Sequence, residues 1–192
     1  MRKIILASKS PRRKKLLSQL GLEFEVHASN YEEGEGTALQ HAKGKALDVA
    51  KHYKNAIVIG VDTVGEYKGR IIGKPKDKNE AKEILGFLNG SKHKVVTGIF
   101  VIDTATGKTA KGISETFVKF CKMTEKEMDA YINSGEGKDK AAGYAIQGFG
   151  ALFVERIEGD YFNVVGLPIF LLSKLLKKIE INLVEICKKI DK

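Results

Sequence analysis

A basic turn near the start of the chain has the composition of an anion-binding site. The apolar run Ile4 to Ala7 leads into Ser10-Pro11-Arg12-Arg13, and a helical pattern of leucines follows. Serine is a favoured N-cap and proline a favoured first helical residue, so a helix is predicted to begin here. Its free N–H groups and two guanidinium groups would suit a polyanion, above all a phosphate chain. Arg13 is expected to be exposed at this helix start. The alternative is a basic surface turn beside an ordinary helix.

Asp62 is a second candidate for chemistry. It follows the continuous apolar run Ile57 to Val61, which predicts a buried strand. A carboxylate at that place should be hydrated, paired or metal-bound, because burying it alone is costly. Ligands collect at strand ends in α/β sheets, so Asp62 is a candidate metal ligand or proton acceptor. An aspartate that caps a turn is an equally good interpretation of the pattern.

Two lysines could bind phosphate. Lys74 lies in Gly73-Lys74-Pro75, where the neighbouring residues predict a tight bend from which the lysine projects. Lys45 lies within a predicted helix over residues 39–51 whose apolar face is made of alanines. Each lysine is a possible point-charge ligand of a phosphate. Taken alone, each also fits an ordinary solvated side chain.

Acidic and amide side chains complete the candidates. Glu32 and Glu33 lie in one loop with Glu35, and a carboxylate pair facing phosphates would need Mg²⁺ or Mn²⁺. The alternative is an acidic surface loop. Gln147 is surrounded by glycines, and its amide could both donate to and accept from the edge of a base. A glycine-rich surface loop explains that segment equally well.

The pattern of predicted elements is that of an α/β protein with a mixed sheet. Strand and helix signals alternate, and Thr106-Gly107 predicts a turn between two neighbouring strands. Asp77 with Glu80, and Thr124 with Glu127, have the spacing of capping boxes. The expected strands are 3–8, 57–61, 70–72, 95–102, 113–121 and 151–157, and the expected helices are 10–20, 39–51, about 77–89, about 124–133 and about 168–179. Residues 180–192 are expected to add an amphipathic helix with Leu183, Ile186, Cys187 and Ile190 on one face.

Composition narrows the class of partner. The 192 residues carry a formal net charge of +9, which favours nucleotides, nucleic acid or an anionic membrane without choosing among them. The two cysteines have no metal-type spacing, and a reducing, cytoplasmic setting is expected. No stretch approaches the ~20 apolar residues that would span a bilayer, and the first apolar run is too short for a signal peptide.

Several motifs, in order, resemble those of the Maf family of nucleoside triphosphate pyrophosphatases. The resemblance extends from residue 3 to about residue 178 and leaves the tail from Glu180 outside. It rests on Leu6-Ala7-Ser8-x-Ser10-Pro11-Arg12-Arg13, Glu33, Lys45-Ala46, Asp62-Thr63, Gly73-Lys74-Pro75, Asn89-Gly90, His93-x-Val95-x-Thr97-Gly98, Ser134-Gly135-Glu136, Asp139-Lys140-Ala141, Ile146-Gln147-Gly148 and Val165-Gly166-Leu167-Pro168.

The resemblance implies an elongated, two-lobed α/β fold with a mixed sheet and a central cleft, of the kind shared with ITPase-like proteins. It implies one catalytic domain over residues 1–179, followed by the appended helix 180–192. It also implies hydrolysis of the α–β phosphoanhydride of a nucleoside triphosphate to a monophosphate and pyrophosphate, with Mg²⁺ or Mn²⁺ as cofactor. A homodimer is left open, and no membrane or nucleic-acid partner is expected.

The resemblance also implies roles for single residues. Ser8, Arg12, Arg13, Lys45 and Lys74 would hold the phosphates, and Glu33 and Asp62 would hold the metal. Asp62, Glu33 and Lys74 would be catalytic, with Asp62 also orienting or deprotonating the attacking water. Arg12, Thr63 and Gln147 match the branch that prefers dTTP and UTP.

The chain departs from the family pattern at several positions. Asn30 and Glu32 stand where the family has aspartates, Gly137 replaces a proline, and Asp160 stands where serine is common. Ala142-Gly143 inverts the usual order next to the predicted base-reading loop. Two rival functions stay open: a nucleic-acid-binding regulator of cell division, and a module that senses nucleotides without turnover.

Overall fold

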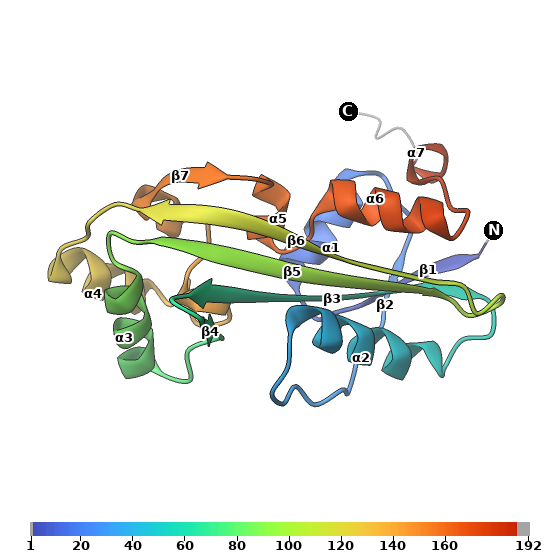
Figure 1. Ribbon diagram of the computed structural model, residues 1–192, viewed down its shortest axis with the longest axis horizontal. Coiled ribbons are helices and arrows are strands. Elements are labelled where there is room, and N and C mark those ends of the chain that lie inside the picture. Colours follow the sequence, from blue (N-terminus) through green and yellow to red (C-terminus); the bar gives the residue numbers. More distant parts are fainter. Residues whose placement is uncertain (1, 188–192) are drawn as a thin grey trace. The chain divides into compact units, whose positions relative to one another are not determined.

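The secondary structure begins where the apolar run predicted it, with a buried first strand. The computed structural model describes residues 2–187 (Figure 1). Its elements are β1 (Lys3–Ala7), α1 (Pro11–Gln19), β2 (Glu25–Val26), α2 (Ala38–Ala50), β3 (Ala56–Tyr67), β4 (Arg70–Ile72), α3 (Lys78–Leu88), β5 (Lys92–Asp103), β6 (Thr109–Phe120), α4 (Glu125–Ser134), the 3₁₀ helices η1 (Ala141–Gly143) and η2 (Phe149–Phe153), β7 (Val154–Glu158), α5 (Tyr161–Val165), α6 (Ile169–Lys178) and α7 (Leu183–Ile186).

The strands form a mixed sheet, so the predicted fold class is confirmed. Within residues 2–187 the order is β2-β1-β3-β5-β6-β7, and β4 pairs with β3. Strand β1 is parallel to both β2 and β3, whereas β4 and β7 are antiparallel to β3 and β6 respectively. The chain divides into two compact units. Unit 1 comprises residues 1–62, 97–114 and 166–192, and unit 2 comprises 63–96 and 115–165.

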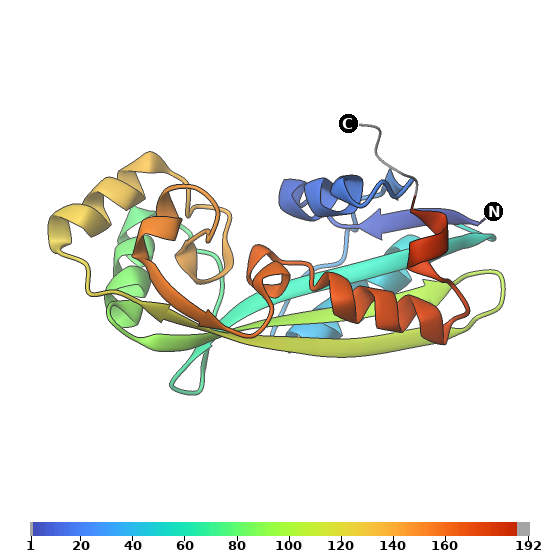
Figure 2. The same ribbon diagram turned by 90° about the horizontal axis from the view of Figure 1, so that it is seen from above.

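In unit 1, helices cover both faces of the strands. Figures 1 and 2 show α2 on one face and α6 on the other. The alanines of α2 pack on β1 and β3 in one apolar cluster. This packing is unusually close, because a Cβ at Gly60 would lie 2.1 Å from the carbonyl oxygen of Ala42. Only glycine leaves room for the helix backbone there, and the helix is thereby held against β3.

In unit 2, β3 and β4 form a hairpin, and α3 packs beside α4. The hairpin turns at Lys68-Gly69, as predicted, with φ of 49° and 74°. Two positive φ values are what a tight two-residue hairpin turn needs. Helix α4 begins with the predicted capping box between Thr124 and Glu127. At α3, Asp77 caps the helix, but Glu80 accepts from the N–H of Lys76 instead, so the predicted reciprocal box is wrong.

Several elements differ from the sequence-based expectation. Strand β2 and helix α5 were not expected, and β3 continues well beyond Val61 to Tyr67. The strand expected at 151–157 begins only at Val154, because Phe149–Phe153 form η2. In the described part of the tail, residues 180–187, helix is present over Leu183–Ile186, and Ile190 lies outside the described residues. Among the described residues, no helix has the length and apolarity needed to cross a membrane.

The core of unit 2 contains a buried histidine. His93 is 2% exposed, its Nε2 lies 2.8 Å from the hydroxyl of Tyr144, and its ring packs edge-on against Phe120. Burial lowers the pKa of His93 from 6.5 to about 4. The ring is therefore neutral in the folded protein at neutral pH.

We predict that His93 makes stability fall as the pH is lowered. Between pH 6.5 and about 4 the unfolded chain takes up a proton at His93 that the folded chain does not, so the free energy of unfolding falls with falling pH. The contribution of this one group is about 3 kcal/mol over that window. Denaturant unfolding of wild type and His93→Phe at pH 7, 6, 5 and 4 measures it. Parallel pH dependences of the two proteins would refute the assignment.

Candidate functional site

Arg13 lies at the centre of the N-terminal turn and is buried. Its Nε donates to the carbonyl oxygen of Gly166 at 2.8 Å, and its Nη1 donates to the carbonyl oxygen of Val61 and to Ser8 Oγ, each at 3.0 Å. Burial lowers the pKa of Arg13 to about 10, although Asp62 nearby acts in the opposite direction. The group therefore keeps its positive charge at neutral pH.

The turn differs from the expected one in two respects. Pro11 is the first helical residue, as predicted, but Ser10 makes no capping hydrogen bond with its side chain; its N–H donates to Ser8 Oγ instead. Arg13 was expected at an exposed helix start, yet it is 9% exposed and points into unit 1. The reason is that carbonyl groups at Val61 and Gly166 need a donor at that place. Arg12 is the half-buried neighbour.

We predict that Arg13→Ala weakens folding as well as activity. The change removes the Arg13 donor from two carbonyl groups and from the Ser8 hydroxyl, which keeps the N–H of Ser10, at a cost of about 3 kcal/mol. The free energy of unfolding, measured with denaturant, should fall by that amount, while Arg12→Ala should change it less. Equal stability of the two variants would show that the three contacts of Arg13 contribute little.

Lys45 joins two carboxylates. Its Nζ lies 2.7 Å from Asp62 Oδ1 and 2.5 Å from Glu33 Oε1, and its side chain is only 12% exposed. The solvated alternative for Lys45 is therefore wrong. The close packing of α2 on β3 at Gly60 is what places Lys45 beside Asp62. Glu32 and Glu35, the other acids of the loop, are exposed.

Asp62 is paired, but it does not lie at a strand end. It is 6% exposed and occupies the middle of β3, which runs on to Tyr67. The carbonyl oxygen of the preceding residue, Val61, accepts a hydrogen bond from Arg13 Nη1. Two consecutive residues of β3, Val61 and Asp62, therefore contact Arg13 and Lys45 respectively. Cationic and anionic groups lie together in this region of unit 1.

Glu33 and Asp62 could hold a divalent cation together with ligands from outside the protein. Glu33 and Asp62 already converge on a single positive charge, the ammonium of Lys45. Among residues 2–187 there is no group of three or more His, Cys, Asp or Glu that could hold a metal ion. Two carboxylates do not make an all-protein cage, but they suit Mg²⁺ that is shared with water and substrate phosphates.

The remaining predicted site residues belong to unit 2. Thr63 follows Asp62 in β3 and is half-buried. Lys74 is exposed just after β4, ahead of α3. Gln147 is exposed and precedes η2. All three residues lie in segments that the structure describes.

A comparison with known protein families decides the relationship of the chain. The family described as "Maf-like protein" matches residues 3–179. The chain belongs to the Maf family. This confirms the resemblance seen in the motifs.

Relatives of this Maf-family chain carry one name. A "dTTP/UTP pyrophosphatase" of Methanosarcina barkeri is 46% identical over 96% of this chain and 98% of its own length. One of a Thermoanaerobacter species, strain X514, is 50% identical over 92% of this chain and 96% of its own. One of Bacillus anthracis is 47% identical over 95% and 98% respectively.

The glycines around Gln147 in this Maf-family chain are explained by close contacts within the protein. Gly148 has φ of 90°, and a Cβ there would lie 2.5 Å from Glu136 Oε2. A Cβ at Gly150 would lie 2.2 Å from the carbonyl oxygen of Ala145. The loop is thus packed against its own protein. Glu136, which sequence reasoning left without a role, is the residue it packs on, and the glycine at Gly148 was the signal for it.

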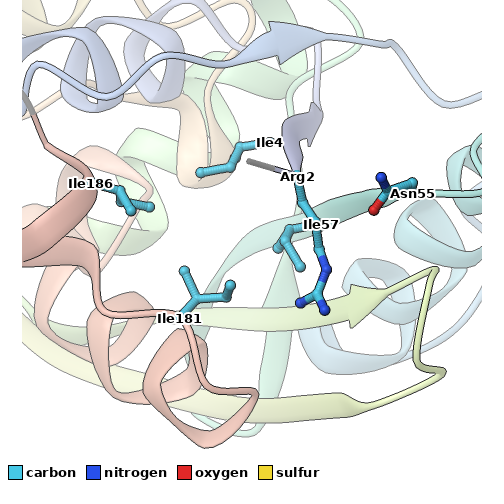
Figure 3. Close-up of a pocket in the computed structure, with 6 residues that line it drawn as sticks. All are labelled: Arg2, Ile4, Asn55, Ile57, Ile181 and Ile186. Carbon is cyan, nitrogen blue, oxygen red and sulfur yellow. The ribbon is translucent and has the colours of Figure 1, made fainter.

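Unit 1 of this Maf-family chain also has a pocket whose lining is mostly apolar, unlike the charged region around Lys45. Figure 3 shows it, and its lining is Arg2, Ile4, Asn55, Ile57, Ile181 and Ile186. The guanidinium of Arg2 is paired with Asp103 at 2.8 Å. An isoleucine-rich hollow does not suit a triphosphate, and none of the predicted site residues lines it.

Proposed function

We propose that this Maf-family protein hydrolyses the α–β phosphoanhydride of nucleoside triphosphates, and that dTTP and UTP are its preferred substrates. The products are a nucleoside monophosphate and pyrophosphate. The names of relatives that are 46–50% identical over nearly the whole chain support the reaction class. The observation that carries the proposal is the ammonium group of Lys45, which is paired with both Asp62 and Glu33. Asp62 lies on β3, next to Val61, whose carbonyl oxygen accepts from Arg13.

In unit 1 the cationic residues would bind the phosphates and the anionic Asp62 would accept a proton. Arg13, fixed by Ser8 and two carbonyl groups, would present its charge to phosphate oxygens, with Arg12 and Lys45 adding to it. Asp62 would receive the proton of the attacking water as the water oxygen bonds to phosphorus and the bridging oxygen leaves. Pyrophosphate then departs with the electron pair of the broken P–O bond.

A divalent ion fits this arrangement at Glu33 and Asp62. When bound, Mg²⁺ or Mn²⁺ would neutralise charge that develops on the phosphates. Lys45 would then keep the two carboxylates close together in the absence of the ion. From unit 2, Lys74 is proposed as a further phosphate ligand and Thr63, with Arg12 and Gln147, as a residue that selects the base.

Product analysis tests the proposal. The purified protein is incubated with dTTP, UTP, CTP, dATP and dGTP, with added Mg²⁺ or Mn²⁺ or with a chelator, and pyrophosphate and monophosphate are measured. Equal amounts of both products, fastest from dTTP and UTP and abolished by the chelator, are expected. Release of orthophosphate would contradict the reaction, and stoichiometric binding without product would favour a nucleotide sensor.

Other expectations from the sequence stay predictions. These are the cytoplasmic location and the division into one catalytic domain over 1–179 and an appended helix over 180–192; a homodimer is still open.

A further inference from the structure

The loop that contains Gln147 is held by a carboxylate from outside the loop. Glu136 Oε2 accepts from the N–H of Phe149 at 2.8 Å, and Glu136 Oε1 accepts from the N–H of Gly150 at 2.9 Å. These are the first two N–H groups of η2. Such groups have no partner within a helix, and the residue that normally serves them is the N-cap side chain. Here the N-cap is Gly148, which has none.

The other side of the loop is tied to the same carboxylate through Tyr131. The Tyr131 hydroxyl accepts from the N–H of Ala145 at 3.0 Å and lies 3.3 Å from Glu136 Oε1, to which it donates. Tyr131 is 1% exposed, and its ring packs edge-on against Phe149. Gln147 therefore lies between two anchors, Ala145 before it and Phe149 after it, that meet at Glu136.

Glu136 itself rests on a rigid support. It follows α4 directly after Gly135, which ends that helix in the left-handed conformation. Its own N–H donates to Ser134 Oγ at 3.2 Å. The end of α4 thus fixes the backbone of Glu136, and the loop cannot move away from Glu136 and Tyr131 without breaking three hydrogen bonds.

We propose that Glu136 is a positioning residue for substrate selection: it fixes the backbone on either side of Gln147, so that the amide meets the base in one orientation. The inference rests on the proposed function, because Gln147 is the proposed base reader. Selection by hydrogen bonds depends on geometry, and a misplacement of about 1 Å can cost roughly 10²-fold. Glu136 would thus act on discrimination between bases and not on the phosphate chemistry.

Glu136→Gln tests the proposal. The variant keeps the shape but turns one acceptor into an –NH₂ group that faces N–H donors. We expect the ratio of kcat/KM for dTTP to that for dGTP to fall by roughly 10- to 100-fold. The change should lie mainly in KM for dTTP, with kcat less affected. The amide protons of Phe149 and Gly150 should exchange faster with solvent in the variant.

Glu127→Gln is the matched control. Glu127 also lies in unit 2, and it also accepts a backbone N–H, from Thr124 at 2.7 Å, but at the start of α4. Both variants should lower the thermal midpoint, whereas only Glu136→Gln should change the dTTP to dGTP ratio. A purely structural role would lower kcat for every substrate together and leave that ratio and KM unchanged, and this result would overturn the proposal.

Two further outcomes are separable. If Glu136→Gln does not fold, Glu136→Asp replaces it. This variant keeps the carboxylate but shortens the side chain by one methylene, and the same ratio of kcat/KM values is measured and judged in the same way. Wild-type protein that releases no pyrophosphate would contradict the proposed function and the inference with it. Wild-type protein that releases pyrophosphate, with an unchanged ratio in the Glu136 variants, would overturn the role of Glu136 alone.

Discussion

Asp62→Asn is expected to keep the fold and to lose turnover by ~10²–10⁴-fold, the range that a general base contributes. The amide has the shape of the carboxylate and still offers an oxygen to Lys45, which also keeps its contact with Glu33. What is lost is the negative charge that would accept a proton or hold a divalent ion. Initial rates with dTTP at saturating Mg²⁺, together with a thermal unfolding curve, measure the two effects separately.

Asp103→Asn is the control for that experiment. Asp103 is another buried aspartate of unit 1, paired with Arg2 at 2.8 Å, and it is not among the proposed site residues. Its substitution should reduce stability and leave kcat unchanged. Near wild-type turnover of Asp62→Asn with saturating metal would mean that Asp62 neither binds the metal nor accepts the proton.

Gln147→Glu is expected to change which base is accepted. The glutamine amide both donates and accepts, so it can complement the O4 and N3–H groups of thymine and uracil, whereas an ionised glutamate only accepts. Sites that hydrogen-bond a substrate group can reject a mismatched partner by as much as ~10⁴-fold. We therefore expect a large loss of kcat/KM for dTTP and UTP, with a smaller loss or a gain for guanine nucleotides, which present donors to a carboxylate.

Gln147→Ala separates the loss of a partner from the gain of a repulsion. It should weaken selection for thymine and uracil without favouring guanine. The measurement is kcat/KM for the same panel of five triphosphates, followed by pyrophosphate release. If Gln147→Glu lowers every substrate by one common factor, the side chain does not read the base and the loop has another purpose.

The sequence predicted those parts of the fold that follow from local rules. Apolar periodicity located the long helices, and the Thr124–Glu127 box and the Lys68-Gly69 turn formed as local chemistry requires. The end of β3 was misplaced because polar Asp62 was taken as the end of a strand. Its carboxylate is instead neutralised by Lys45, and such a tertiary partner leaves no local signal.

The candidate site was predictable in its residue types but not in its contacts. The family motifs named Arg13, Lys45 and Asp62, and composition alone could not show that Lys45 joins Asp62 to Glu33. Arg13 was misjudged as exposed, because its partners at Val61 and Gly166 are backbone carbonyl groups and carry no sequence signature. Glu136 was missed although Gly148 was a signal for it, because the groups that it binds are backbone N–H groups.

The hydrogen bond from Arg13 to Gly166 also bears on how the protein is made. The two residues are 153 positions apart, so a ribosome adding ~5–20 residues per second needs roughly 8–30 s between them. Every segment of unit 2 precedes Gly166, whereas unit 1 still lacks residues 166–192 when unit 2 has been synthesised. During translation the part with Gln147 can therefore fold first, and the arginine turn waits for the last segment before its carbonyl partners are complete.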